Sequence, residues 1–234
     1  MAIAPTREEF VAAHKTGKRQ VVWTKLVSDL ETPVSAMLKL QHESTQAFLL
    51  ESVEGGETRG RYSIVGIDPD LMWRCMGNKP EISRTPPFTD ESFEPAWDDS
   101  LSSLRQLVQT HRMELPEFLP PMAAGLIGYM GYDMVKLMER LPDTKPDNIN
   151  IPDACFLRPR TMLIFDSVHG VVYIVAPIWE TDGNASTHYS QAVARIERVV
   201  RLLQGPIDQR NYYKDVADSK PNFQSNLTLD EYKG

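Results

Sequence analysis

A carboxylate and a hydroxyl stand side by side at Glu51 and Ser52, near the end of the apolar run 47–53. Side chains alternate between the two faces of a strand, so Leu50 and Ser52 would share one face, and Leu49 and Glu51 the other. An amino-acid ligand with a large side chain needs an apolar wall, an acceptor for its ammonium group and donors for its carboxylate. These residues fit part of such a pocket, although a core strand that ends at a hairpin is the simpler interpretation.

Two glycine-rich stretches could bind phosphate or a dinucleotide. After residues 55–60, a phosphate loop would need Lys and Ser/Thr at the start of a helix, whereas residues 61–63 are typical of a strand. Glu54 and Glu57 would also repel phosphate. In residues 125–131 the glycines follow a G-x-x-G-x-x-G spacing and not the G-x-G-x-x-G of a dinucleotide fold. Glycine within an apolar strand more often indicates a close approach of two backbones, which is the interpretation we favour.

No catalytic constellation is visible among the other polar residues. The five histidines share no metal-ligand spacing, and no serine stands in a nucleophile elbow. Cys75 and Cys155 are far apart and match no metal or redox motif, so we expect buried free thiols in a reducing compartment. The sequence therefore predicts no catalytic residue and no metal ligand in these 234 residues.

The composition restricts the class of protein. Hydrophobic residues make up 41% of the chain and charged residues 24%, as in ordinary globular proteins. The net charge of −7 disfavours nucleic acid or an anionic membrane as the main partner, because both require a basic surface. The N-terminal residues contain no signal-peptide core, and no apolar run is long enough to span a bilayer. These features predict a cytoplasmic protein.

The elements that must position these residues follow from periodicity and capping. T-x-x-E at Thr6 and Glu9 predicts a helix through residues 10–13, and Thr32 followed by Pro33 predicts a second helix over residues 32–40. Two more helices are predicted at residues 100–112 and 187–203 from their apolar spacing. The predicted strands are 20–27, 47–53, 62–67, 71–76, 160–165 and 171–176. Because hairpins dominate this order, we predict an α+β fold with a mostly antiparallel sheet and flanking helices.

The last ten residues contain a second T-x-x-E box, formed by Thr228 and Glu231. A capping box predicts the start of a helix, but the residues that follow this one are too few to form a stable isolated helix. The expectation is that the natural chain continues past Gly234 into another domain.

Four blocks together resemble a known family. Residues 48–69 (FLLESVEGGETRGRYSIVGIDP) are similar to the N-terminal signature of anthranilate synthase component I, and residues 123–142 (AAGLIGYMGYDMVKLMERLP) resemble its G-x-x-G-Y-x-x-Y-D block. Residues 165–175 (FDSVHGVVYIV) resemble the following hairpin, and residues 225–234 (SNLTLDEYKG) the junction to the chorismate-binding domain. The resemblance implies that residues 1–224 form an N-terminal regulatory and scaffolding domain of that fold, and that residues 225–234 begin a truncated C-terminal domain.

The resemblance also implies an activity for the whole enzyme. It would be a lyase of tryptophan biosynthesis that converts chorismate and ammonia into anthranilate and pyruvate, with Mg²⁺ bound by the C-terminal domain and ammonia supplied from glutamine by an amidotransferase subunit, component II. The residues that bind chorismate and Mg²⁺ would lie beyond this chain, so the chain alone is expected to be inactive.

By the same resemblance, this part would bind tryptophan as a feedback inhibitor. Leu50, Glu51 and Ser52 match the family's L-E-S motif, and Tyr62 falls across the hairpin from them. Two alternatives stay open: the N-terminal region of the related synthase that makes 4-amino-4-deoxychorismate, or an amino-acid-binding module without enzymatic activity.

Overall fold

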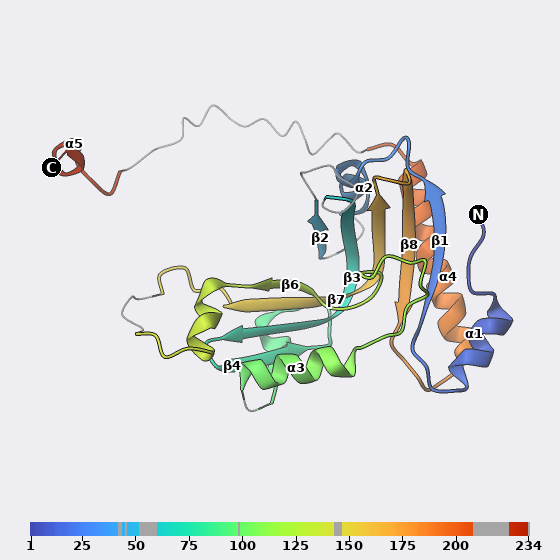
Figure 1. Ribbon diagram of the computed structural model, residues 1–234, viewed down its shortest axis with the longest axis horizontal. Helices are drawn as coiled ribbons and strands as arrows, with labels where there is room; N and C mark the ends of the chain where they lie inside the picture. The colour runs from blue at the N-terminus through green and yellow to red at the C-terminus, as the bar shows by residue number, and fades with distance from the viewer. Residues whose placement is uncertain are drawn as a thin grey trace.

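A computed structural model describes residues 1–41, 44, 46–51, 60–97, 99–142, 147–207 and 225–233. The described residues form one antiparallel sheet of eight strands with the order β1-β8-β7-β3-β4-β5, in which β2 pairs with β3 and β6 pairs with β7 (Figure 1). The strands are β1 (Gln20–Val27), β2 (Ala47–Leu50), β3 (Tyr62–Met76), β4 (Lys79–Ser83), β5 (Glu94–Pro95), β6 (Ile127–Met130), β7 (Ala154–Asp166) and β8 (Val171–Ile178). The predicted α+β class and the predicted antiparallel sheet are confirmed.

Strands β3 and β7 run through the whole sheet and divide it into two parts. In one part, the first half of β3 pairs with β2 and the second half of β7 pairs with β8. In the other part, the second half of β3 pairs with β4 and the first half of β7 pairs with β6. Figure 1 shows the first part upright and the second lying across it. The pairing register of β3 with β7 changes between Pro69 and Leu71, and the preceding residue, Asp68, adopts a φ of 51°. Such a bulge bends a strand without ending it.

The prediction of two separate strands at residues 62–67 and 71–76 is therefore wrong. The turn-forming residues Asp68 and Pro69 suggested a break, but β7 pairs with β3 on both sides of them. Two ion pairs hold the bulge in place, one between Asp68 and Arg198 and one in which Arg158 Nε lies 2.7 Å from an Asp70 oxygen. The neighbouring strand and these charges keep the chain extended where local turn preference would bend it.

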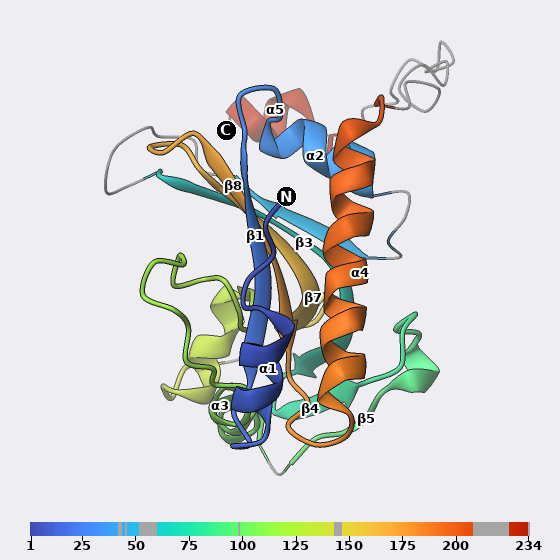
Figure 2. The same ribbon diagram turned by 90° about the vertical axis from the view of Figure 1, so that its right-hand side faces the viewer.

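Three helices cover one face of the upright part of the sheet. Helix α4 (Ala185–Gln204) runs along it, with α1 (Arg7–His14) beside one end and α2 (Pro33–Leu40) beside the other (Figure 2). The capping box of Thr6 and Glu9 is present. At the start of α2, the Thr32 hydroxyl accepts a hydrogen bond from the backbone N–H of Ser35, and the Ser35 hydroxyl accepts one from the backbone N–H of Thr32. Apolar residues of all three helices and four strands make a single core here, which includes Phe10, Leu40, Ile174 and Ile196.

A second core fills the other part of the sheet. Helix α3 (Ser100–Thr110) and the 3₁₀ turn η2 (Tyr132–Leu137) pack there against the far end of β3, and a shorter 3₁₀ turn, η1 (Asp90–Ser92), lies between β4 and β5. The buried indole of Trp73 donates a hydrogen bond of 2.9 Å to the Ser103 hydroxyl. This bond joins α3 to the centre of the sheet.

The glycine-rich run forms β6, and its glycine is needed for close packing. A Cβ atom on Gly128 would lie 1.8 Å from the backbone oxygen of Cys155 on β7. The interpretation of this run as a close approach of two backbones is confirmed. Near the end of the chain, α5 (Leu229–Lys233) begins at the predicted box, in which Thr228 N–H donates to Glu231 over 2.8 Å.

Two further expectations from the sequence concern membrane-spanning segments and the domain boundary. No helix among the described residues is long and apolar enough to cross a membrane. The predicted domain boundary between residues 224 and 225 adjoins residues 208–224, which lie outside the described part of the chain. The boundary therefore stays a prediction.

Candidate effector site

The strand pair β2–β3 positions the first residue of the predicted effector site. Leu50 ends β2 opposite Ile64, and Phe48 lies opposite Gly66. The Phe48 ring covers Gly66 so closely that a Cβ atom there would lie 2.2 Å from it. Aromatic cover of a strand glycine fixes the register of a hairpin, and here it fixes where Leu50 emerges from the sheet.

The two faces of this hairpin meet different surroundings. Leu49 packs into the core beneath α2 and α4. Phe48 and Tyr62 instead pack on the opposite face, with Ile64 and Met162. By alternation Leu50 lies on that second face too, so the structure brings Leu50 and Tyr62 to the same side of the sheet.

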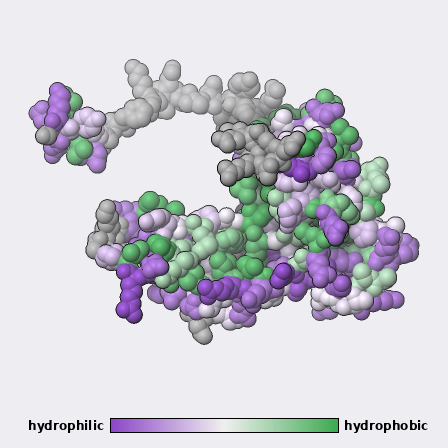
Figure 3. All heavy atoms as spheres, viewed as in Figure 1, coloured by the Kyte–Doolittle hydropathy of each residue, from purple (hydrophilic) through white to green (hydrophobic). Residues whose placement is uncertain are grey.

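This second face is apolar and partly open. Leu50 is 49% exposed, whereas Tyr62, the first residue of β3, is half-buried. Figure 3 shows apolar side chains along the inner angle of the molecule, where the two parts of the sheet meet. At β6 and just beyond it, Tyr129, Met130 and Tyr132 are also exposed. An apolar surface of this kind is typical of a site that binds a ligand or another part of a protein.

The remaining predicted residues are placed less completely. Glu51 directly follows β2 and is exposed, so its carboxylate is accessible to a cationic ligand. Ser52 and the loop 53–59 lie outside the residues that the structure describes. The strand predicted over residues 47–53 is described as β only to Leu50. The structure thus joins Leu50 and Tyr62 on one face, while the roles of Glu51 and Ser52 stay predictions.

A charged cluster that the sequence did not indicate anchors the start of β3. Arg61 Nε and one of its terminal nitrogens donate to the two oxygens of Asp166, over 3.0 and 2.7 Å. Asp166 also accepts from the backbone N–H groups of Val168 and His169 and contacts His169 Nδ1 at 2.8 Å. Burial alone would raise the pKa of Asp166, but the hydrogen bonds from Arg61 and His169 outweigh it and hold that pKa well below its usual value.

The Arg61 guanidinium also lies over the Tyr62 ring, 4.8 Å from its centre. The cluster therefore fixes both the turn between β7 and β8 and Arg61, the residue directly before Tyr62. In the sequence, Asp166 and His169 lie in a stretch, residues 166–170, that is typical of a turn between two β-rich runs. Their partner is 105 positions away along the chain, and no local pattern in one sequence reveals such a pairing.

Metal ligands and thiols among the described residues bear on the chemistry of this part. No group of three His, Cys, Asp or Glu side chains among them is placed to hold a metal ion. Cys75 and Cys155 are free, as predicted, but only Cys75 is fully buried, whereas Cys155 is half-buried. Burial raises the pKa of both thiols, which disfavours the reactive thiolate.

Comparison with known proteins finds relatives that match almost the whole chain. The chain is 44% identical over 228 residues to anthranilate synthase component 1 of Cereibacter sphaeroides, a match that covers 97% of this chain and 45% of the relative. It is 32% identical over 206 residues to the protein of the same name from Thermus thermophilus, covering 88% of this chain and 40% of that one. The chain belongs to the anthranilate synthase component 1 family. It spans less than half the length of these curated relatives.

A solved structure shares the fold. The crystal structure of anthranilate synthase component I from Streptococcus pneumoniae TIGR4 superposes with a TM-score of 0.52 at 18% sequence identity, covering 79% of this chain and 37% of that chain. At this identity the likeness shows the fold alone. No model of a protein family matches the chain.

Proposed function

We propose that this chain forms the regulatory and scaffolding part of an anthranilate synthase that converts chorismate and ammonia into anthranilate and pyruvate. The observation that carries the proposal is the 44% identity with a protein of that name over nearly the whole chain. The name "component 1" supports a second component, an amidotransferase that supplies ammonia from glutamine. The relatives' names also favour this reaction over the formation of 4-amino-4-deoxychorismate. A cytoplasmic location, which fits a biosynthetic enzyme, is part of the proposal.

The chemistry itself is assigned to residues beyond this chain. The described residues include no catalytic constellation and no metal-binding cluster, so we assign chorismate and Mg²⁺ no ligand among them. What this part contributes is a scaffold and a control site. That division is consistent with a chain that spans 45% of its relative.

The control site that we propose is the end of β2, with tryptophan as the effector. Leu50 and Tyr62 share an apolar face that would receive the indole ring, and Glu51 supplies a carboxylate for the ammonium group. Ser52, the next residue, is proposed as a hydrogen-bonding partner of the ligand from its match to the family motif. The Arg61–Asp166–His169 cluster would hold Tyr62 in place.

The apolar inner angle suggests how binding could control catalysis. Leu50 lies on the same face as Phe48 and Tyr62 and is half-exposed, and we propose that the rest of a longer enzyme packs against this face. Tryptophan held between the two parts would favour one arrangement of them over another. Such coupling is reciprocal, so tryptophan should weaken chorismate binding and chorismate should weaken tryptophan binding by the same factor.

A product assay tests the proposed reaction. A protein of the relatives' full length that contains this sequence should form anthranilate from chorismate, ammonia and Mg²⁺, detected by its fluorescence. The 234-residue chain alone should form none. If 4-amino-4-deoxychorismate accumulates in place of anthranilate, the assigned reaction is wrong. If the chain alone turns over chorismate, the division between control and catalysis is wrong.

A further inference from the structure

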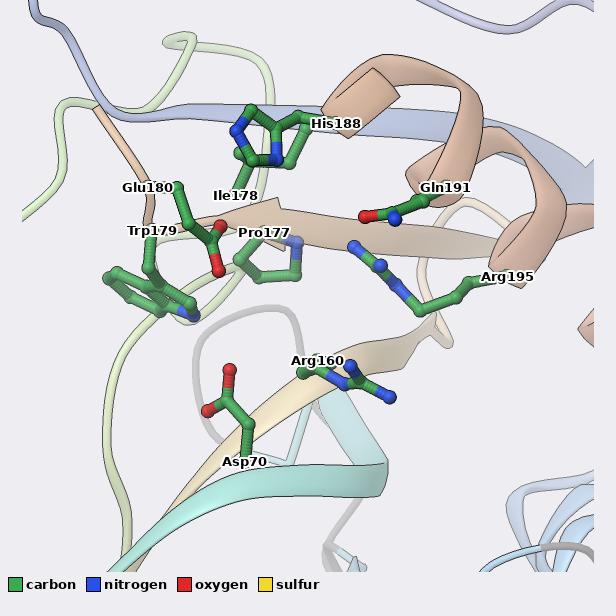
Figure 4. Close-up of a pocket in the computed structure, with 9 residues that line it drawn as sticks. All are labelled: Asp70, Arg160, Pro177, Ile178, Trp179, Glu180, His188, Gln191 and Arg195. Carbon is green, nitrogen blue, oxygen red and sulfur yellow. The ribbon is translucent and has the colours of Figure 1, made fainter. Parts of the chain in front are cut away.

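A small cavity lies far from the candidate effector site, at the end of β8. Figure 4 shows it between Trp179 and Glu180 at that end, Arg195 on α4, Arg160 on β7 and Asp70 on β3. Its volume is about 40 Å³, enough for a small polar group or a few water molecules. Arg160 and Asp166 are six residues apart on β7, which corresponds to about 20 Å along a strand. The cavity is thus separate from the site around Leu50 and Tyr62.

Hydrogen-bond donors at this cavity lack acceptors. Trp179 is 6% exposed, and its Nε1 has no hydrogen-bond partner in the described part of the chain. The same is true of the buried Nε of Arg195. In Figure 4 the indole nitrogen is on the side of the ring that faces the cavity, and the Arg195 guanidinium extends into it from the opposite side. Buried donors without protein partners are uncommon in folded proteins, and their usual acceptors are then an ordered water molecule or an ion.

The charges at the cavity show which kind of acceptor is missing. Neither Arg160 nor Arg195 makes a hydrogen bond or an ion pair with any residue that the structure describes. The nearest carboxylate on β3, Asp70, is already paired with Arg158 at 2.7 Å. Burial lowers the pKa of Arg195, and the positive charge of Arg160 lowers it further, against the opposing effect of the carboxylates of Glu180, Asp70 and Asp68. A negative charge between the two guanidinium groups would stabilise both of them.

We propose that this cavity binds a small oxyanion, a carboxylate or a phosphate group, held by the guanidinium groups of Arg160 and Arg195 and by the indole N–H of Trp179. Guanidinium groups bind such anions with two parallel hydrogen bonds, and the indole can donate one more. A bridging water molecule could satisfy the indole, but it would not offset the repulsion between the two guanidinium groups. A metal ion is disfavoured because no metal-binding cluster is found among the described residues.

Glu180 provides a way to distinguish an anion from a cation at this site, because its carboxylate also lines the cavity and would repel an anion. Replacing it by glutamine should therefore strengthen anion binding. The same replacement would weaken the binding of a cation. Glu180 and Arg160 are both exposed, so neither substitution is expected to disturb folding.

The test is a titration of the ¹⁵N-labelled chain that monitors the indole N–H signal of Trp179, assigned with a Trp179→Phe variant. Sodium phosphate and sodium acetate are the probes, and sodium chloride at equal ionic strength is the control. A saturable shift with either probe is expected, and the probe that saturates at the lower concentration identifies the preferred anion. Arg160→Gln should weaken its affinity on the order of tenfold, as expected for a lost charge-assisted contact.

Arg201→Gln is the matched control, because Arg201 is exposed on the same helix as Arg195 and does not line the cavity. It should leave the affinity unchanged, whereas Glu180→Gln should increase it. Equal responses to phosphate, acetate and chloride would overturn the proposal, as would a Glu180→Gln variant that binds more weakly. Neither result depends on which reaction the longer protein catalyses.

Discussion

Replacing Asp166 by asparagine tests the cluster that holds the start of β3. The carboxylate accepts from Arg61 and from the backbone N–H groups of two turn residues, Val168 and His169. Asparagine keeps one acceptor oxygen, but its NH₂ group would face donors. The substitution therefore leaves Arg61 without its carboxylate and at least one donor without an acceptor.

The magnitude follows from the burial of the two partners. The Asp166 side chain is 2% exposed, whereas that of Arg61 is 27% exposed. Breaking a fully buried ion pair costs about 3–5 kcal/mol, and the partial access of Arg61 to water reduces this to about 2 kcal/mol. For a domain of 150–250 residues, 1 kcal/mol corresponds to roughly 2–4 °C in melting temperature. We expect Asp166→Asn to lower the melting temperature by about 4–8 °C.

The assay is thermal unfolding of the purified chain, followed by circular dichroism between pH 3 and pH 8. Asp90→Asn is the matched control, because Asp90 also pairs with an arginine, Arg74, but its side chain is 88% exposed. An exposed pair contributes about 0.5 kcal/mol, so this variant should melt within about 2 °C of the wild type.

The pH dependence gives a second criterion. Because the pKa of Asp166 is lowered in the folded protein, its stabilisation is present above the pKa of an unfolded aspartate, about 3.9, and is lost as the pH falls below it. The difference between wild type and Asp166→Asn should be constant near neutral pH and should shrink below about pH 4. Equal melting temperatures for the two proteins at pH 7 would refute the account of this cluster.

Three other substitutions test the packing of the sheet and helices in the same unfolding assay. Gly128→Ala should cost about 3 kcal/mol, because the new Cβ would overlap the Cys155 carbonyl oxygen; an effect below 1 kcal/mol would contradict this approach. Ser103→Ala should cost about 1–3 kcal/mol, because it leaves the buried Trp73 N–H without an acceptor; no effect would mean that another acceptor is present. Thr32→Ala should cost about 1 kcal/mol by removing the cap of α2, and an unchanged melting temperature would show that the cap contributes nothing.

Much of the fold could be predicted because its signals are local. The stretch 20–27 is rich in β-branched and aromatic residues, and β1 has these bounds. The caps at Thr6 and Thr32 mark where α1 and α2 begin. The α4 periodicity is also local, since the residues that face the sheet are spaced three or four apart.

The features that were missed depend on residues far apart in the sequence. The continuity of β3 through Asp68 and Pro69 is imposed by β7 and by Arg198, which is 130 positions away from Asp68. The Arg61–Asp166 pair and the cavity at Trp179 likewise join distant segments. For the candidate site, the motif at residues 50–52 came from family resemblance, and only the structure showed that Leu50 and Tyr62 share a face.

The measurement that tests the central claim most directly is tryptophan inhibition of a full-length protein that contains this sequence. The comparison is between wild type, Ser52→Ala and Ser102→Ala, in which Ser102 is exposed on α3 and serves as the control. Loss of a hydrogen bond to a charged ligand should raise the half-inhibitory tryptophan concentration of Ser52→Ala on the order of tenfold, with Ser102→Ala unchanged. Equal inhibition of all three proteins would contradict an effector site at the end of β2.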